Sequence, residues 1–168
     1  MKDTAYTGRA WFDGRIASPT DSDGKILEPS IPDRFVASDD MHTTAESYAR
    51  FLLSVMNREG LTEAVAKDRE TIQLSRIADS CPPAIAITCP EDVGPGLGWE
   101  VFKFSGDTFL MHTGNDKGTF TFGYFSPTSH SGIVIFTNSS NGHQIVLPIL
   151  DRLGKDPGFV AFLRATVN

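Results

Sequence analysis

The region between residues 96 and 137 constrains the fold most, because it places aromatic residues in short alternating segments separated by turn residues. Seven of the twelve phenylalanines lie between residues 102 and 136. Alternation of apolar and polar side chains over about four to eight residues is typical of a strand with one buried face. The predicted strands are Gly98–Phe104, Thr108–Thr113, Thr119–Phe125 and Ile133–Thr137. Short connections join them, so we predict an antiparallel sheet of about four strands.

Helical patterns lie on both sides of these strands. Thr43-x-x-Glu46 has the spacing of a capping box, and apolar residues at helical spacing follow it. Thr62 has the character of a second N-cap. After the strands, Gln144–Leu153 has the pattern of an apolar helix, and a last short helix is expected after it. Helices, then antiparallel strands, then helices predict an α+β fold in which helices flank the sheet.

The first 40 residues differ from the rest of the chain. They are rich in Asp, Ser, Pro and Gly and show neither strand nor helix periodicity, although Trp11 and Phe12 offer apolar anchors. A loop this long in a compact domain usually contributes to a site or packs on its neighbours. We therefore expect residues 1–40 to be an irregular segment packed on a domain that comprises residues 41–168.

Composition and charge disfavour several classes of partner. The net charge is −6, from 15 basic and 21 acidic residues, so nucleic acid is not an expected partner. No apolar run approaches the roughly 20 residues of a membrane-spanning helix. The first residues lack the apolar segment of a secretory signal, so no signal is expected and no compartment is assigned. The four histidines are scattered and no HExxH motif is present, so neither a metal nor another cofactor is expected.

The two cysteines, Cys81 and Cys89, flank a proline-rich stretch. A disulfide that closes this loop is sterically conceivable. Disulfides persist mainly in oxidising compartments, however, and the sequence shows no export signal. We therefore expect two free thiols here, with the disulfide as the alternative.

Several stretches resemble, in order, the C-terminal half of the serine β-lactamase-like superfamily, which includes class C β-lactamases, DD-peptidases, esterases and D-aminopeptidases. They are MKDTAY at the start, residues 36–52, Gly96-Leu97-Gly98-Trp99, His112-Thr113-Gly114, Gly118-x-Phe120 and Phe136-Thr137-Asn138. The third of these resembles the family's Y-G-L-G-W segment, and the fourth lies where the family has Lys-Thr-Gly or His-x-Gly. Two departures are Asp39-Asp40, where glycines are usual, and Ser47, where an acidic residue is common.

The resemblance implies an incomplete β-lactamase/transpeptidase-like fold and a serine hydrolase that works through an acyl-enzyme. The family's Ser-x-x-Lys and Tyr-x-Asn motifs precede the segment that MKDTAY resembles, so we expect them to lie outside this sequence. Two similar strings are present. Ser22-Asp23-Gly24-Lys25 lies in a predicted turn rather than the helix that the motif needs, and Ser139-Ser140-Asn141 lies in a predicted loop. We expect neither to act in catalysis.

The third family motif supplies the candidate site residues. By resemblance, His112 is the catalytic candidate, which contacts the carboxylate or leaving group of the substrate. Thr113, Gly114 and Asn115 are the substrate-binding candidates: a hydroxyl, a position without a Cβ, and a backbone N–H for the oxyanion. Without the resemblance, His112 would be interpreted as an ordinary hydrogen-bonded histidine at a strand end.

Two functional hypotheses follow. In the first, the chain is the C-terminal portion of a β-lactamase-related hydrolase of β-lactams, D-amino-acid peptides or esters, and is inactive without a missing N-terminal half. Its partners are then a small amide or ester substrate and either that half or a second copy at an exposed sheet edge. In the second, the chain is a non-catalytic binding module or the remnant of a truncated or split gene.

Overall fold

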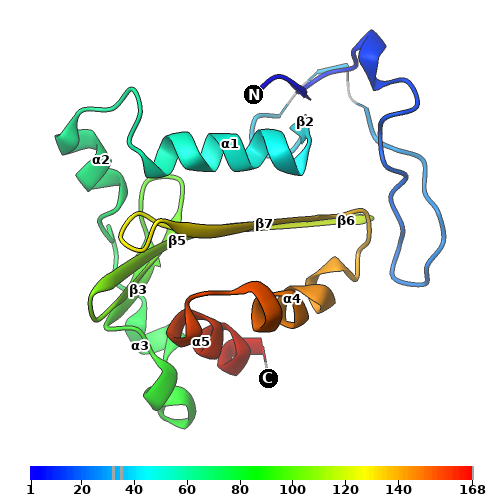
Figure 1. The fold of residues 1–168 in the computed structure, drawn as a ribbon. Coiled ribbons are helices and arrows are strands. Elements are labelled where there is room, and N and C mark those ends of the chain that lie inside the picture. The colour runs from blue at the N-terminus through cyan, green and yellow to red at the C-terminus, as the bar shows by residue number, and fades with distance from the viewer. Residues whose placement is uncertain (32, 35, 168) are drawn as a thin grey trace.

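The computed structural model describes residues 1–31, 33–34 and 36–167, with the side chain of residue 167 left out. Its centre is a sheet with helices on both faces (Figure 1). Helix α1 (Ala45–Met56) lies along one face, and helices α4 (Val146–Leu153) and α5 (Pro157–Val167) cover the other. This arrangement confirms the predicted α+β class, with an antiparallel sheet flanked by helices.

The sheet contains five antiparallel strands in the order β3-β4-β5-β6-β7. The last four correspond to the predicted strands. They are β4 (Glu100–Phe104), β5 (Asp107–Asp116), β6 (Thr119–Ser126) and β7 (Ser131–Thr137). Strand β5 is longer than predicted, so the His112-Thr113-Gly114 motif lies inside the strand and pairs with β6 over its whole length.

Strand β3 (Asp92–Pro95) was not predicted, because its glycine and proline indicate a break in regular structure. It is an edge strand that pairs with β4, and Pro95 lies at its end, where a missing N–H costs least. Gly94 is required for space, since a Cβ there would lie 2.1 Å from the carbonyl oxygen of Leu74. The fifth strand therefore depends on a backbone approach that strand periodicity does not reveal.

Two short helices connect α1 to β3. Helix α2 (Glu63–Arg69) begins at Thr62, whose hydroxyl accepts from the Val65 N–H as predicted. Helix α3 (Ile77–Ser80) is followed by the 3₁₀ helix η2 (Pro83–Thr88). A further 3₁₀ turn, η3 (Gly142–Ile145), begins the segment predicted as a helix from Gln144 and leads into α4.

The predicted cap of α1 is wrong by one residue. Thr44, not Thr43, is the N-cap, and its hydroxyl accepts from the Ser47 N–H at 3.1 Å. Thr43 instead belongs to β2 (His42–Thr43), which pairs with β1 (Thr4–Ala5), and its hydroxyl is 2.8 Å from that of Thr4. Strand pairing by Thr43 thus moves the helix start to the next threonine.

Each face of the sheet has its own apolar core. On the α1 face, Leu52 and Met56 pack against Val101, Leu110 and Phe125. The opposite face is an aromatic cluster in which Phe109 and Phe159 stack with ring centroids 4.7 Å apart. It consists of residues from β3 to β7 with α4 and α5: Val93, Phe102, Phe109, Phe122, Tyr124, Ile135, Val146, Leu150, Phe159, Val160 and Phe162.

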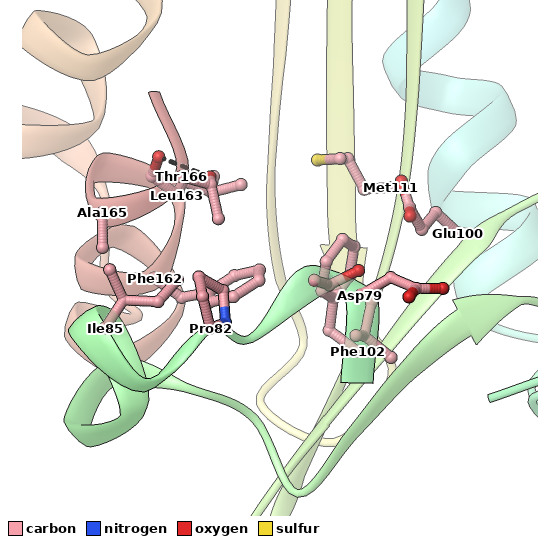
Figure 2. A pocket seen from close by; sticks show the side chains of 12 residues that line it. Asp79, Pro82, Ile85, Glu100, Phe102, Met111, Phe162, Leu163, Ala165 and Thr166 are labelled. Atoms are coloured by element: carbon pink, nitrogen blue, oxygen red, sulfur yellow. Dashed lines mark hydrogen bonds between the residues drawn. The ribbon is translucent and has the colours of Figure 1, made fainter. Parts of the chain in front are cut away.

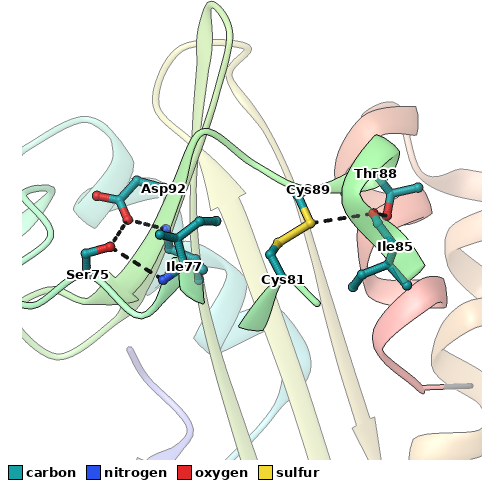
Figure 3. The surroundings of a disulfide bond; sticks show 8 residues. Ser75, Ile77, Cys81, Ile85, Thr88, Cys89 and Asp92 are labelled. Atoms are coloured by element: carbon teal, nitrogen blue, oxygen red, sulfur yellow. Dashed lines mark hydrogen bonds between the residues drawn. A yellow bond between two sulfur atoms is a disulfide. The ribbon is translucent and has the colours of Figure 1, made fainter. Parts of the chain in front are cut away.

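The disulfide expectation is the clearest correction. Cys81 follows α3, Cys89 follows η2, and the two are joined by a disulfide with a Cα–Cα distance of 6.0 Å (Figure 3). The expected free thiols are therefore wrong. Pro82 is the N-cap of η2, a compact 3₁₀ segment that returns the chain to the end of α3 and brings Cys89 next to Cys81. The expectation of free thiols came from the missing export signal alone, whereas the local fold brings the two cysteines within bonding distance.

The first 40 residues form an extended loop beside one end of the sheet (Figure 1). Within its described part, β1 and the 3₁₀ turn η1 (Ala10–Phe12) are the helical and strand elements. Phe12 is buried and packs against His42, with ring centroids 5.3 Å apart, whereas Trp11 remains partly exposed. The division at residue 40 stays a prediction.

Candidate functional site

One half of β5 has an open edge. Strand β4 begins at Glu100, which pairs with Met111, so the pairing between these strands covers only Asp107–Met111 of β5. From His112 to Asp116, the described structure pairs β5 with β6 alone. An unpaired strand edge offers backbone N–H and C=O groups to an extended ligand. The four predicted site residues all lie on this open edge.

His112 projects on the α1 face of the sheet. Strand alternation places it on the same face as Leu110, which belongs to the core under α1. Its exposed ring meets Trp99 edge-on, with ring centroids 6.3 Å apart. No hydrogen bond holds the His112 ring within the described part of the chain. The side chain is thus oriented by Trp99, and both ring nitrogens are available to a ligand.

Trp99 contacts both the apolar core and the motif histidine. Its ring is half-buried, packs edge-on against Phe125 at 5.1 Å, and belongs to the apolar core on the α1 face. The same indole forms the wall beside His112. The sequence signal for this role is that Trp99 directly precedes β4, whose first residue pairs with Met111, the neighbour of His112.

The remaining motif residues alternate along β5. Thr113 and Asn115 are exposed and project on the α5 face, whereas Gly114 lies between them on the face of His112. A Cβ at Gly114 would lie 2.6 Å from the Thr121 hydroxyl of β6. Glycine at this position therefore leaves room for the Thr121 side chain of the neighbouring strand, and it also leaves the strand open to a substrate.

Tyr48 of α1 lies behind the open edge. Gly123, which pairs with His112, leaves room for the Tyr48 ring, since a Cβ at Gly123 would lie 3.4 Å from Tyr48 Cε1. The ring also contacts Phe136 at 5.4 Å. Burial raises the pKa of the Tyr48 hydroxyl above its ordinary value, so this side chain remains neutral at physiological pH.

The N-terminal loop borders the same end of the sheet. Residues 20–26 form a hairpin turn whose Thr20 bonds both to the β5–β6 turn, through the Gly118 carbonyl, and to the loop after β7, through Asn138 and Ser140. The Asn138 amide donates to the Ser18 carbonyl at 2.8 Å. Gly118 has a φ of +84°, and a Cβ there would lie 2.4 Å from Pro19 Cβ, so this approach requires glycine.

The two motif-like strings lie where the sequence placed them. Ser22 and Lys25 belong to the hairpin turn, in which the Asp21 carboxylate accepts from the N–H groups of Asp23 and Lys25. The string Ser139-Ser140-Asn141 lies in the loop after β7, where the Ser140 hydroxyl accepts from the Gly118 N–H at 2.9 Å. Both strings serve as connections around the open edge, and neither lies on a helix.

No group of three or more His, Cys, Asp or Glu side chains with metal-binding geometry occurs among the described residues. In the same part of the chain, none of the helices is long and apolar enough to cross a membrane. The structure thus brings together His112, Thr113, Gly114 and Asn115 with Trp99 and the N-terminal hairpin, as a site built on an open strand edge.

Comparison with known proteins agrees with this fold. The chain is similar to an octameric penicillin-binding protein homologue from Pyrococcus abyssi, with 15% sequence identity and a TM-score of 0.62. The match covers 99% of this chain and 34% of the other, so this chain spans about a third of that protein's length. No curated protein sequence matches. The sequence profile of the beta-lactamase family matches residues 1–153, nearly the whole chain, and the chain therefore belongs to the beta-lactamase family.

Proposed function

We propose that this chain is the substrate-binding portion of a β-lactamase-related serine hydrolase whose nucleophile is supplied by polypeptide outside this sequence. Its substrate is a small amide or ester: a β-lactam, a D-amino-acid peptide or an ester. The observation that carries the proposal is the open edge of β5 at His112–Asp116, in a chain whose family match extends through residue 153.

The edge suits the proposed chemistry. An extended substrate can add to β5 through backbone hydrogen bonds, while Gly114 presents no side chain on the His112 face. His112 would contact the carboxylate or leaving group of the substrate from the α1 face, and Thr113, which projects on the opposite face, would offer its hydroxyl to the same group across the open edge of β5. The Asn115 N–H would be one oxyanion donor, a contribution of about 3–4 kcal/mol in the transition state when a nucleophile is in place.

The proposal also implies that these 168 residues do not hydrolyse substrate by themselves. A serine hydroxyl needs an adjacent base to become a nucleophile. Ser22 and Lys25 lie in a turn, so no helix places their side chains on one face. Incubation with a chromogenic cephalosporin or a p-nitrophenyl ester, followed by intact-mass measurement, is expected to show no adduct. Acylation at any serine would contradict this part of the proposal.

Binding is tested separately on the same chain. Titration of the ¹⁵N-labelled protein with benzylpenicillin is expected to shift the amide resonances of residues 112–116 before those of other strands. His112→Ala should weaken this binding, and His112→Lys should retain it, because the ligand is an anion. His130→Ala removes an exposed histidine from the β6–β7 turn and serves as the matched control. Shifts that avoid β5, or equal effects of the two alanine variants, would favour a remnant without this function.

A further inference from the structure

A cavity of about 460 Å³ lies on the α5 face of the sheet, beside the open edge of β5 (Figure 2). Its floor consists of Val93, Phe102 and Met111 from the sheet, and α5 closes one side with Phe162 and Leu163. This volume falls within the range of small-molecule sites, roughly 300–1,000 Å³. Most of the lining is apolar, so the few charged groups decide which ligand fits.

The charged groups of the cavity are both carboxylates. Asp79 of α3 and Glu100 of β4 lie at the same end of it, opposite Ala165 and Thr166 of α5 (Figure 2). Among the residues that the structure describes, no lysine, arginine or histidine lines the cavity. Neither carboxylate takes part in an ion pair or side-chain hydrogen bond within the described part of the chain. Asp79 is exposed and Glu100 half-buried, so their combined negative charge is not offset by a protein cation.

The side of the cavity opposite the carboxylates adds no charge. It is formed by Leu163, Ala165 and Thr166 of α5, and the Thr166 hydroxyl is already used, because it donates to the Leu163 carbonyl at 2.9 Å. The cavity therefore combines an apolar floor with two carboxylates at one end, which together suit a cation with an apolar arm.

The cavity adjoins the candidate site at one residue pair of the β4–β5 ladder. Glu100 pairs with Met111, both side chains face the cavity, and the next residue of β5 is His112. Successive strand residues are about 3.3 Å apart. Thr113 and Asn115 continue along β5 on the cavity face. His112 projects on the α1 face and the cavity lies on the α5 face, so a ligand that crosses the open edge of β5 can place one group beside His112 and another in the cavity.

We propose that this cavity binds an organic ammonium group carried on an apolar arm. Resting on the proposed function, we assign that group to the hydrolase substrate, which would then be an amide or ester with a cationic side arm. Asp79 lies in α3, two residues before Cys81, and the disulfide to Cys89 ties the end of this helix to the end of η2, which restrains the wall that carries the carboxylate.

The test uses three probes of similar shape on the ¹⁵N-labelled chain at pH 7 and low salt: 2-phenylethylamine, 2-phenylethanol and 3-phenylpropionate. The ammonium is expected to bind best, with shifts at the cavity residues, and the carboxylate is expected not to bind. Asp79→Asn and Glu100→Gln should each weaken ammonium binding about three- to fivefold, the scale of one partly exposed charge. Glu91→Gln removes an exposed carboxylate outside the cavity and should change nothing.

Equal affinity for the ammonium and the alcohol, or unchanged binding in both carboxylate variants, would overturn the proposal. Ala165→Trp, which fills the cavity from α5, should abolish the shifts, and retained binding in that variant would place the ligand elsewhere. These readouts need no acyl-enzyme. Ammonium binding without benzylpenicillin shifts on β5 would preserve the cavity and reject the proposed function, and the reverse result would do the opposite.

Discussion

Asp156 is a buried carboxylate whose charge must be balanced by hydrogen bonds. It is 8% exposed, and its carboxylate accepts hydrogen bonds from the hydroxyls of Tyr124, at 3.0 Å, and Ser131, at 2.9 Å. These bonds tie the start of α5 to β6 and β7. A buried charge is tolerated only when its bonds are satisfied, so the three side chains act as one unit.

Replacing that carboxylate should be costly. We expect Asp156→Ala to lower the free energy of unfolding by about 2–4 kcal/mol, because the buried Tyr124 hydroxyl and the partly buried Ser131 hydroxyl lose their acceptor. Urea unfolding measures the change. The control is Asp151→Ala, which breaks an exposed ion pair with Arg164 and should cost less than about 1 kcal/mol. Equal losses in the two variants would show that the Asp156 network adds nothing to stability.

Tyr124 predicts a loss of stability at alkaline pH. Burial, and secondarily the Asp156 charge and hydrogen bond, raise the pKa of its hydroxyl well above the ordinary value of about 10. Above pH ~10 the unfolded chain loses this proton while the folded chain keeps it, so stability falls as pH rises. Urea unfolding between about pH 8.5 and 11 should show this slope, and Tyr124→Phe should reduce it. An unchanged slope in Tyr124→Phe would contradict the assignment.

Among the elements, the α3–η2 loop depends most on one covalent bond. The disulfide closes residues 81–89, which contribute Pro82 and Ile85 to the cavity, and Asp79 and Ser80 of α3 line it directly before Cys81. Ahead of α3, the Ser75 hydroxyl donates to the Asp92 carboxylate of β3 at 2.5 Å (Figure 3). Helix α3 is therefore anchored to β3 before its start and to the end of η2 after its last residue.

Removing the disulfide should loosen this loop without unfolding the sheet. The double variant Cys81→Ser with Cys89→Ser is expected to lose about 2 kcal/mol of stability, as a short closed loop predicts. Binding of 2-phenylethylamine should weaken as well, because Asp79 is no longer held in place. Thermal unfolding and the probe titration measure the two effects, and reductant on the unaltered chain should reproduce both. Unchanged values in reductant would contradict them.

The elements also show which features the sequence predicts. The aromatic alternation of β4 to β7 and the threonine cap of α2 are local patterns, and both were predicted from residues alone. Strand β3 and the shift of the α1 cap depend on contacts with Leu74 and Thr4, which no local pattern contains. The site residues came from the family resemblance. Their shared open edge follows from where β4 begins, and that is a property of the assembled sheet.

At the scale of the whole molecule, β7 forms an edge without a neighbouring strand in the described structure. Apolar side chains border it on both faces: Leu53 of α1 is 52% exposed and Leu153 of α4 is 66% exposed. A cavity of about 420 Å³ lies between them, over Ile133 and Val134. An unpaired strand with apolar borders is a template for pairing with another chain.

We therefore expect the isolated chain to self-associate through the β7 edge. Sedimentation over a wide concentration range should show dimers or larger species, and Leu53→Glu with Leu153→Glu should shift them to monomer. Leu74→Glu changes an equally exposed leucine, 64% exposed, away from this edge and should leave the association intact. A compact monomer at all concentrations would contradict the expectation.

The hairpin at residues 18–26 fixes an order of events during synthesis. Its partners follow it by more than a hundred residues: Thr20 bonds to Asn138, Ser18 to the Asn138 amide, and Ser22 to the Asn141 amide, at separations of 118, 120 and 119 residues. A ribosome adds about 5–20 residues per second, so these partners appear roughly 6–24 seconds later. Ser18, Thr20 and Ser22 must therefore wait without these partners until almost all of the sheet has been made.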